Sequence, residues 1–161
     1  MEDIMNINFE ISTEEDAPML YNMQKEAFLP LLKKYQDEDT NPANESIDRV
    51  ITRINNPNGN FYKIVLDKKV VGAICVVREE NLPHYWISPM FIHPDYQGKG
   101  IAQLVLKSLE VTVSQAEKWK LATIIEEKGN VYLYEKLGYK RIGSQKKINE
   151  RATLGYFEKQ M

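Results

Sequence analysis

The chain of 161 residues is 43% hydrophobic, which is enough for one compact domain with its own core. It is too short to presume two domains, so we predict a single domain over residues 1–161. The 21 basic and 23 acidic residues give a net charge of -2, whereas a general nucleic-acid or anionic-membrane surface needs a basic excess. Neither class of partner is therefore expected.

The N-terminal segment and the single cysteine indicate in which cellular compartment the protein is expected. Residues 1–6 contain no basic region leading into a long apolar stretch, so no signal peptide is predicted. No apolar run approaches the roughly 18 residues that a membrane-spanning helix needs. The lone Cys75 lies in an apolar run, which predicts a small buried core residue in a reducing compartment. We expect a cytoplasmic protein.

The first third of the chain predicts one strand and two helices. Apolar residues alternate with polar ones over residues 7–11, as in a half-buried strand. Ser12 or Thr13 then caps a helix that keeps a helical apolar period to about Tyr35, with three acidic residues in its first turn. A second, shorter helix is predicted over residues 45–54.

The middle of the chain predicts three strands, over residues 61–66, 70–78 and 84–92. The first two form a hairpin through a short charged turn. Pro89 lies inside the third strand, where it cannot donate a ladder hydrogen bond. An interruption, a bulge or a sheet edge is therefore expected at that point.

The rest of the chain alternates between helix and strand. An amphipathic helix from Ile101 reaches Ala116, and a later short helix ends at Gly138, a typical C-terminal stop. The remaining predicted elements are a strand at 121–126, the short helix itself at 130–137, and a strand pair at 139–148 and 151–158. The element order βαα-βββ-α-β-α-ββ predicts a mixed α/β sheet.

A glycine-rich segment, Gln97-Gly98-Lys99-Gly100-Ile101-Ala102, connects a turn to the long helix. Glycines let the backbone turn tightly and present amide N–H groups, and a helix N-terminus adds unpaired N–H groups and partial positive charge. Lys99 adds a formal charge, so a pyrophosphate is a natural occupant. The segment fits neither the P-loop, because Lys99 precedes glycine, nor the Rossmann pattern, because position 103 is Gln. By itself it is equally an ordinary turn that opens a helix.

Two motifs together resemble one known family. Residues 92–102 resemble the acetyl-CoA loop of the GNAT N-acetyltransferase superfamily, Gln/Arg-x-x-Gly-x-Gly/Ala, matched here by Gln97, Gly100 and Ala102. Residues 133–139 (LYEKLGY) resemble the family's Leu-Tyr-Glu-Lys-Leu-Gly-Phe segment. One long helix and one strand separate the two motifs, as in the family. The chain is accordingly identified as a member of this superfamily.

The resemblance implies a fold, a cofactor and part of a site. The fold is a mostly antiparallel sheet of about seven strands, splayed between strands 4 and 5 and flanked by about four helices. Acetyl-CoA is the implied cofactor, with its pyrophosphate on residues 97–102. The strand before this loop would offer backbone groups to the pantetheine arm, through Met90, Phe91 and Ile92. The Met90 N–H would bind the thioester carbonyl, as an oxyanion hole does.

The resemblance also implies roles for two residues of the second motif region. Tyr134 matches the tyrosine that protonates the departing thiolate, and a phenol is protonated at neutral pH. Many members carry an asparagine seven residues before this tyrosine, but this chain has Glu127 there. Asn130 is instead interpreted as the helix N-cap and as a CoA contact.

The sequence does not identify the general base. The glutamate that some relatives carry on the strand before the loop corresponds here to Trp86, so it does not transfer. Glu126, at the end of the following strand, is the first candidate, and His84 is the second.

Acceptor specificity in the family lies mainly in the first two helices and their connection. Phe28, Tyr35 and the acidic residues 37–39 fall there, and they would suit a cationic amine such as a polyamine or an amino sugar. A solvated acidic loop is the alternative. The predicted reaction is direct attack of a small-molecule amine on acetyl-CoA; a peptide N-terminal acetyltransferase and a non-catalytic CoA sensor are the other candidates. We predict no metal site, and a monomer or homodimer.

Overall fold

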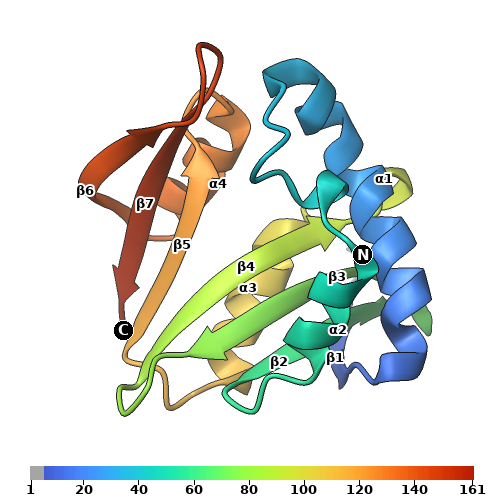
Figure 1. Cartoon of the computed structure of the whole chain (residues 1–161). Coiled ribbons are helices and arrows are strands. Elements are labelled where there is room, and N and C mark those ends of the chain that lie inside the picture. Colours follow the sequence, from blue (N-terminus) through green and yellow to red (C-terminus); the bar gives the residue numbers. More distant parts are fainter. Residues whose placement is uncertain (1–5) are drawn as a thin grey trace.

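The computed structural model describes residues 6–161 and places seven strands in one sheet, in the order β1-β2-β3-β4-β5-β7-β6. Strands β4 and β5 run parallel and all other neighbours run antiparallel, which confirms the predicted mixed fold (Figure 1). The strands are β1 (Ile7–Ile11), β2 (Gly59–Leu66), β3 (Lys69–Arg78), β4 (His84–Ile92), β5 (Lys118–Ile124), β6 (Lys140–Lys147) and β7 (Thr153–Gln160). The α-helices are α1 (Ala17–Tyr35), α2 (Ile47–Ile54), α3 (Ile101–Thr112) and α4 (Lys128–Lys136).

Helices cover both faces of the first four strands. Side chains alternate along β3, so that Ala73 and Cys75 pack with α1 and α2, whereas Ile74 and Val76 belong to the cluster that includes α3. Figure 1 shows α1 and α2 in front of the sheet and α3 behind it. Cys75 is fully buried, as predicted.

Three boundaries in the second half of the chain differ from the predicted ones. β5 spans Lys118–Ile124 rather than 121–126, and α3 ends at Thr112, before Ala116. α4 begins at Lys128, so the N-cap position belongs to Glu127. Asn130 is therefore not the N-cap: its backbone N–H already donates to the Glu127 carbonyl, 3.1 Å away, inside the first turn.

β4 contains the expected irregularity at Pro89. On one side of it Ile87 pairs with Val76, and on the other Met90 pairs with Ile74. Ser88 and Pro89 together therefore oppose Cys75 alone, which is a β-bulge. The prediction of an interruption or bulge is confirmed.

The sheet also splays where the resemblance implied. β4 and β5 pair only between residues 84–86 and 118–120. Beyond Trp86 and Lys120 the two strands separate, as Figure 1 shows, while β5 continues to pair with β7 as far as Ile124. This separation opens the cleft that carries the candidate site.

Among residues 6–161, no helix combines the length and the apolar character that crossing a membrane would require.

Candidate active site

Two adjoining cavities lie where β4 has separated from β5. One, of about 320 Å³, extends toward the connection between α1 and α2 and is lined by both separated strands. The other, of about 360 Å³, extends toward the glycine loop and contacts Gln97 and Ala102. The residues that line both cavities are Phe28, Leu31, Met90, Glu127, Asn130 and Tyr134. A reaction between a ligand in each cavity would take place at this junction.

The glycine loop is held in the conformation that the sequence predicted. Gly98 and Gly100 have φ values of +74° and +78°, in the left-handed region that favours glycine. Apart from their chain neighbours, no atom lies within 4 Å of a Cβ built on either residue, so the loop is open at both positions. The Gln97 side chain donates to the Ile92 carbonyl oxygen at 2.8 Å and ties the loop to the end of β4.

The loop leads directly into α3, so the first backbone N–H groups of the helix belong to the same cradle. The Ile101 side chain is buried in the core, so only its backbone is available to a ligand. Lys99 lies at the rim, with its Nζ 5.8 Å from the Tyr96 ring centroid. A pyrophosphate fits this open, donor-rich and positively charged cradle.

The backbone of β4 directs groups toward the cleft that make no hydrogen bond to β3. His93 N–H donates to the Val71 carbonyl of β3 at 2.7 Å, and hydrogen-bonded pairs alternate along an antiparallel ladder. Phe91 therefore bonds to β3, whereas the N–H and C=O groups of Met90 and Ile92 point away from β3, toward the missing stretch of β5. The Ile92 carbonyl accepts from Gln97, which agrees with this direction.

Tyr134 lies on α4 and lines both cavities. Its half-buried ring packs against Tyr139 and Phe157, with centroid distances of 5.9 Å and 6.3 Å. Burial raises the pKa of Tyr134 to about 12. The phenol is therefore a neutral proton donor at any physiological pH.

Asn130, the other predicted α4 contact, also lines both cavities, although it is not the N-cap. Its amide donates to the Thr123 hydroxyl at 3.5 Å, which links the first turn of α4 to β5.

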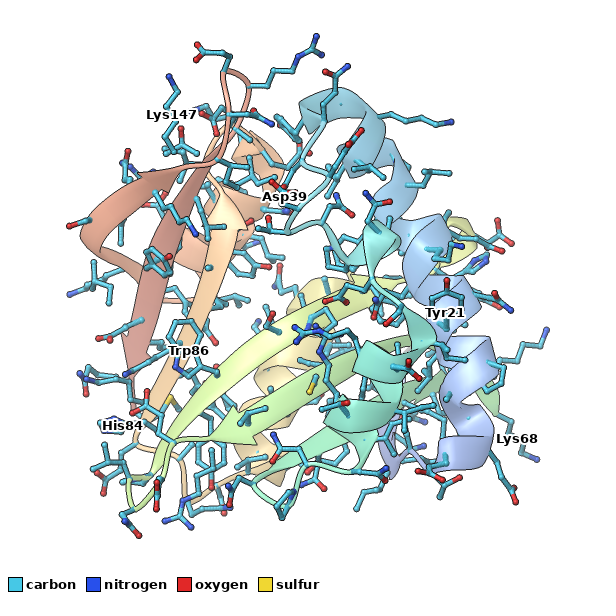
Figure 2. All side chains as sticks on the ribbon, viewed as in Figure 1. Tyr21, Asp39, Lys68, His84, Trp86 and Lys147 are labelled. Carbon is cyan, nitrogen blue, oxygen red and sulfur yellow. The ribbon has the colours of Figure 1, made fainter. Side chains whose placement is uncertain are left out.

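The structure separates the two predicted bases from these groups. The exposed Glu126 accepts a hydrogen bond from Thr153 N–H at 2.8 Å and lines neither cavity. Burial would raise the pKa of Glu126, but the hydrogen bond from Thr153 and its other partners outweigh it, so this pKa is lowered. His84 lies at the far end of β4, 3.6 Å from the Glu79 carboxylate, and Figure 2 shows it remote from Asp39 at the opposite end of the cleft.

The carboxylate at the junction is Glu127, which the sequence indicated only as a departure from the family motif. Its side chain is 22% exposed, lines both cavities and forms an ion pair with Lys34 of α1 at 3.3 Å. The signal that could have identified it is its position, seven residues before Tyr134.

The connection between α1 and α2 forms the outer wall of the first cavity. Of the acidic residues 37–39, only Asp37 lines this cavity; it is buried and accepts hydrogen bonds from the backbone and hydroxyl of Thr40. Glu38 and Asp39 are exposed. Phe28 lines the cavity, whereas Tyr35 is buried outside it.

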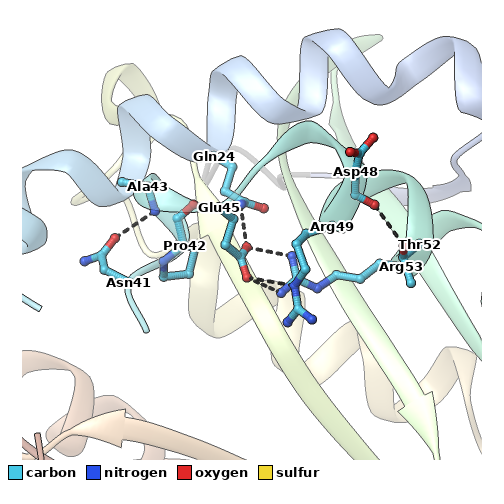
Figure 3. A network of polar contacts seen from close by, with 9 residues as sticks. All are labelled: Gln24, Asn41, Pro42, Ala43, Glu45, Asp48, Arg49, Thr52 and Arg53. Carbon is cyan, nitrogen blue, oxygen red and sulfur yellow. Dashed lines mark hydrogen bonds and ion pairs between the residues drawn. The ribbon is translucent and has the colours of Figure 1, made fainter. Parts of the chain in front are cut away.

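A polar network fixes this wall to the body of the protein (Figure 3). The Gln24 amide donates to the Pro42 carbonyl at 2.9 Å and to Glu45 at 2.8 Å. Arg53 of α2 binds the Glu45 carboxylate through two hydrogen bonds of 2.7 Å and 2.6 Å. Burial alone would raise the pKa of Glu45, but the bonds and charge of Arg53 outweigh it, so this pKa is lowered.

Comparison with known proteins agrees with the geometry. A family model described as an acetyltransferase (GNAT) domain matches residues 31–153. The chain therefore belongs to the GNAT acetyltransferase family, and it is an enzyme of the acyltransferase class. A search of curated proteins finds no match to the sequence.

Solved structures share the fold over nearly the whole chain. An acetyltransferase from Thermus thermophilus has a TM-score of 0.77 at 14% identity and 97% coverage of both chains. The ribosomal-protein-S18-alanine N-acetyltransferase from Escherichia coli has a TM-score of 0.75 at 14% identity, covering 96% of this chain and 94% of that one. A spermidine N-acetyltransferase from Vibrio cholerae, solved with CoA and spermine, has a TM-score of 0.73 at 19% identity and 94% coverage of both.

Proposed function

We propose that this protein transfers an acetyl group from acetyl-CoA to a primary amine of a small molecule, by direct attack within a ternary complex. The observation that carries the proposal is the junction of the two cavities, which is lined by Met90, whose N–H points away from β3, and by the neutral phenol of Tyr134. One cavity leads to the glycine loop and the other to the wall between α1 and α2. Each substrate therefore has its own side of the cleft.

Residues of β4 and the loop supply the acetyl-CoA site in this proposal. The open cradle of residues 97–102 holds the pyrophosphate with backbone N–H groups and Lys99. Met90 and Ile92 bind the pantetheine arm through the backbone groups that point into the cleft. Asn130 contributes an amide beside them. Acetyl-CoA, when bound, supplies the activated thioester.

Two groups of this chain act on the thioester. The Met90 N–H stabilises the negative charge that develops on the carbonyl oxygen as the amine attacks, which is the role of an oxyanion hole. The Tyr134 hydroxyl donates a proton to the departing sulfur. Cys75 is fully buried and burial raises its pKa to about 11, so it is not a nucleophile here. The proposed transfer therefore involves no acyl-cysteine intermediate.

For the acceptor we propose a cationic amine of small size. Asp37 and Glu127 place two carboxylates on the wall of the first cavity, and Phe28 adds an aromatic face for a cation. The volume of about 320 Å³ is that of a small-molecule site. The spermidine acetyltransferase of the same fold acts on such an amine, but at 19% identity it supports the fold alone.

The test combines binding and turnover. Addition of CoA should raise the thermal midpoint, because a ligand that binds only the native state stabilises it. Release of free CoA thiol from acetyl-CoA is then measured with diamines, amino sugars, neutral amines and peptides. Preference for cationic small amines supports the proposal, and preference for peptides would indicate an N-terminal acetyltransferase. Binding of CoA without turnover of any amine would indicate a sensor. The cytoplasmic location, the single domain and the oligomeric state stay predictions.

A further inference from the structure

We infer that Glu127 binds the acceptor's ammonium group beside the thioester and accepts a proton from its nitrogen during transfer. The inference deepens the proposed acetyl transfer and rests on it. It assigns the general base to a residue that the family motif does not supply.

The position of Glu127 is the first argument. Among the described residues that line both cavities, Glu127 alone carries a carboxylate, and Met90 and Tyr134 line the same junction. Its backbone is fixed on both sides, because its N–H donates to the Ile124 carbonyl at 3.0 Å and its carbonyl accepts from Asn130 at 3.1 Å. Its side chain makes no N-cap hydrogen bond and stays available to a ligand.

The second argument is that this carboxylate already holds a primary ammonium group. Lys34 reaches from α1 and places its Nζ 3.3 Å from the Glu127 Oε1. The Lys34 side chain is 58% exposed, and exposed ion pairs of this kind contribute little to stability. An acceptor ammonium entering the cavity can therefore replace Lys34 on the same oxygen atoms.

The other carboxylates near the cleft are engaged elsewhere. Asp37 accepts hydrogen bonds from Thr40 and lines only the first cavity. Glu126 accepts from Thr153 and lines neither. Lys34 of α1 forms an ion pair with Glu127, and Tyr134 and Asp37 line the first cavity with it. Its chain neighbours Glu126 and Lys128 are also charged, and the guanidinium of Arg151 donates to the Lys34 carbonyl at 3.5 Å.

The proton inventory of the transfer is balanced. Glu127 takes one proton from the bound ammonium and passes it to solvent, and the free amine nitrogen then forms a bond to the carbonyl carbon. The carbon–sulfur bond breaks as Tyr134 protonates the sulfur, and the second proton of the nitrogen returns to Tyr134 through solvent. The sum is one amide, one CoA thiol and one proton.

The experiment compares Glu127→Gln with the neighbouring Glu126→Gln, using the cationic amine that the parent protein acetylates best. General-base catalysis typically contributes about 10²–10⁴-fold, so Glu127→Gln should lower kcat/KM at pH 7 by at least about 100-fold. The deficit should shrink as pH rises, because free amine then forms without a base. Glu126→Gln should stay close to the parent at every pH. Lys34→Met should lower the KM for the amine, by up to about fivefold, because the acceptor no longer has to displace the lysine.

Folding is checked by the CoA-induced rise in thermal midpoint, which Glu127→Gln should retain. A folded Glu127→Gln protein with parental turnover and an unchanged pH profile would overturn the inference. An equal loss in Glu126→Gln, or a loss in Glu127→Gln that is constant with pH, would also overturn it. Absence of turnover in the parent with every amine would overturn the proposed function itself, and the two failures are therefore distinguishable.

Discussion

Replacing Tyr134 by Phe removes one hydroxyl from the junction of the two cavities and leaves the aromatic packing in place. The ring keeps its neighbours Tyr139 and Phe157 at 5.9 Å and 6.3 Å. The free energy of unfolding at neutral pH should therefore change by less than about 1 kcal/mol. For a chain of this size that is a change in midpoint of at most about 4 °C.

The same variant should behave differently in alkali. Burial raises the pKa of Tyr134 to about 12, whereas an unfolded tyrosine titrates near 10. Because the folded pKa is the higher one, this contribution to stability is complete below pH 10 and is lost as pH rises from 10 to 12. At pH 11 the loss in the parent is about 1.4 kcal/mol, from the tenfold difference in the two protonated fractions. The phenylalanine variant does not suffer this loss.

Two measurements test the role of Tyr134. The free energy of unfolding is measured in urea at pH 8 and at pH 11. Between these two pH values it should fall by about 1.4 kcal/mol more in the parent than in the variant. Turnover at pH 7 should fall by about 100-fold or more if the phenol protonates the leaving sulfur. Unchanged turnover would remove the acid role, and an unchanged stability difference would refute the burial argument.

Three further predictions concern the loop, the wall and the core. Gly100→Ala should weaken CoA binding, measured by calorimetry, because the left-handed backbone at φ +78° costs alanine about 1 kcal/mol or more. Gly129 lies outside the left-handed region, so Gly129→Ala should leave CoA binding unchanged. Equal effects of the two substitutions would contradict this reasoning. Glu45→Gln should lower the free energy of unfolding by about 2 kcal/mol, which corresponds to a fall of roughly 4–8 °C in the thermal midpoint. The control Glu10→Gln, at an exposed residue, should hardly change the midpoint. Because folding lowers the pKa of Glu45, that difference should shrink in acid, below about pH 4. Cys75 should resist a thiol reagent at pH 8 in the native protein and react in urea; rapid native reaction would contradict its burial.

The elements that the sequence predicted well have a continuous apolar run or a clear apolar period. β3 contains such a run and α1 keeps a helical apolar period, and the predicted ends of β3, β4 and α1 lie within a few residues of the observed ones. β5 was misplaced because it begins Lys118-Trp119-Lys120, where two charged residues flank the buried tryptophan. Lys118 forms an ion pair with Glu158 of β7, and Lys120 forms one with Glu79. Both partners lie far away in the sequence.

The boundary of β5 also decides which of two neighbouring carboxylates lies beside the cleft. Extending β5 to residue 126 made Glu126 the last strand residue and Glu127 a linker. The strand in fact ends at Ile124, a turn follows, and Glu127 occupies the N-cap position of α4 beside the cleft. The loop and Tyr134 could be predicted because each lies in a contiguous sequence motif. The position of Glu127 could not be predicted, because it depends on the exact residue at which β5 ends.

The bulge at Ser88 and Pro89 explains why Met90 is available at all. Before the bulge, Glu79 N–H donates to the His84 carbonyl, which sets the hydrogen-bonded pairs of the β3–β4 ladder. Continued without a bulge, that alternation would pair Met90 with Ala73 and direct its N–H into β3. The extra residue shifts the alternation by one, so Met90 instead pairs with Ile74 at a position that is not hydrogen-bonded. A single inserted residue thus turns the Met90 N–H toward the cleft, at the point where β5 has already separated and left room for a thioester.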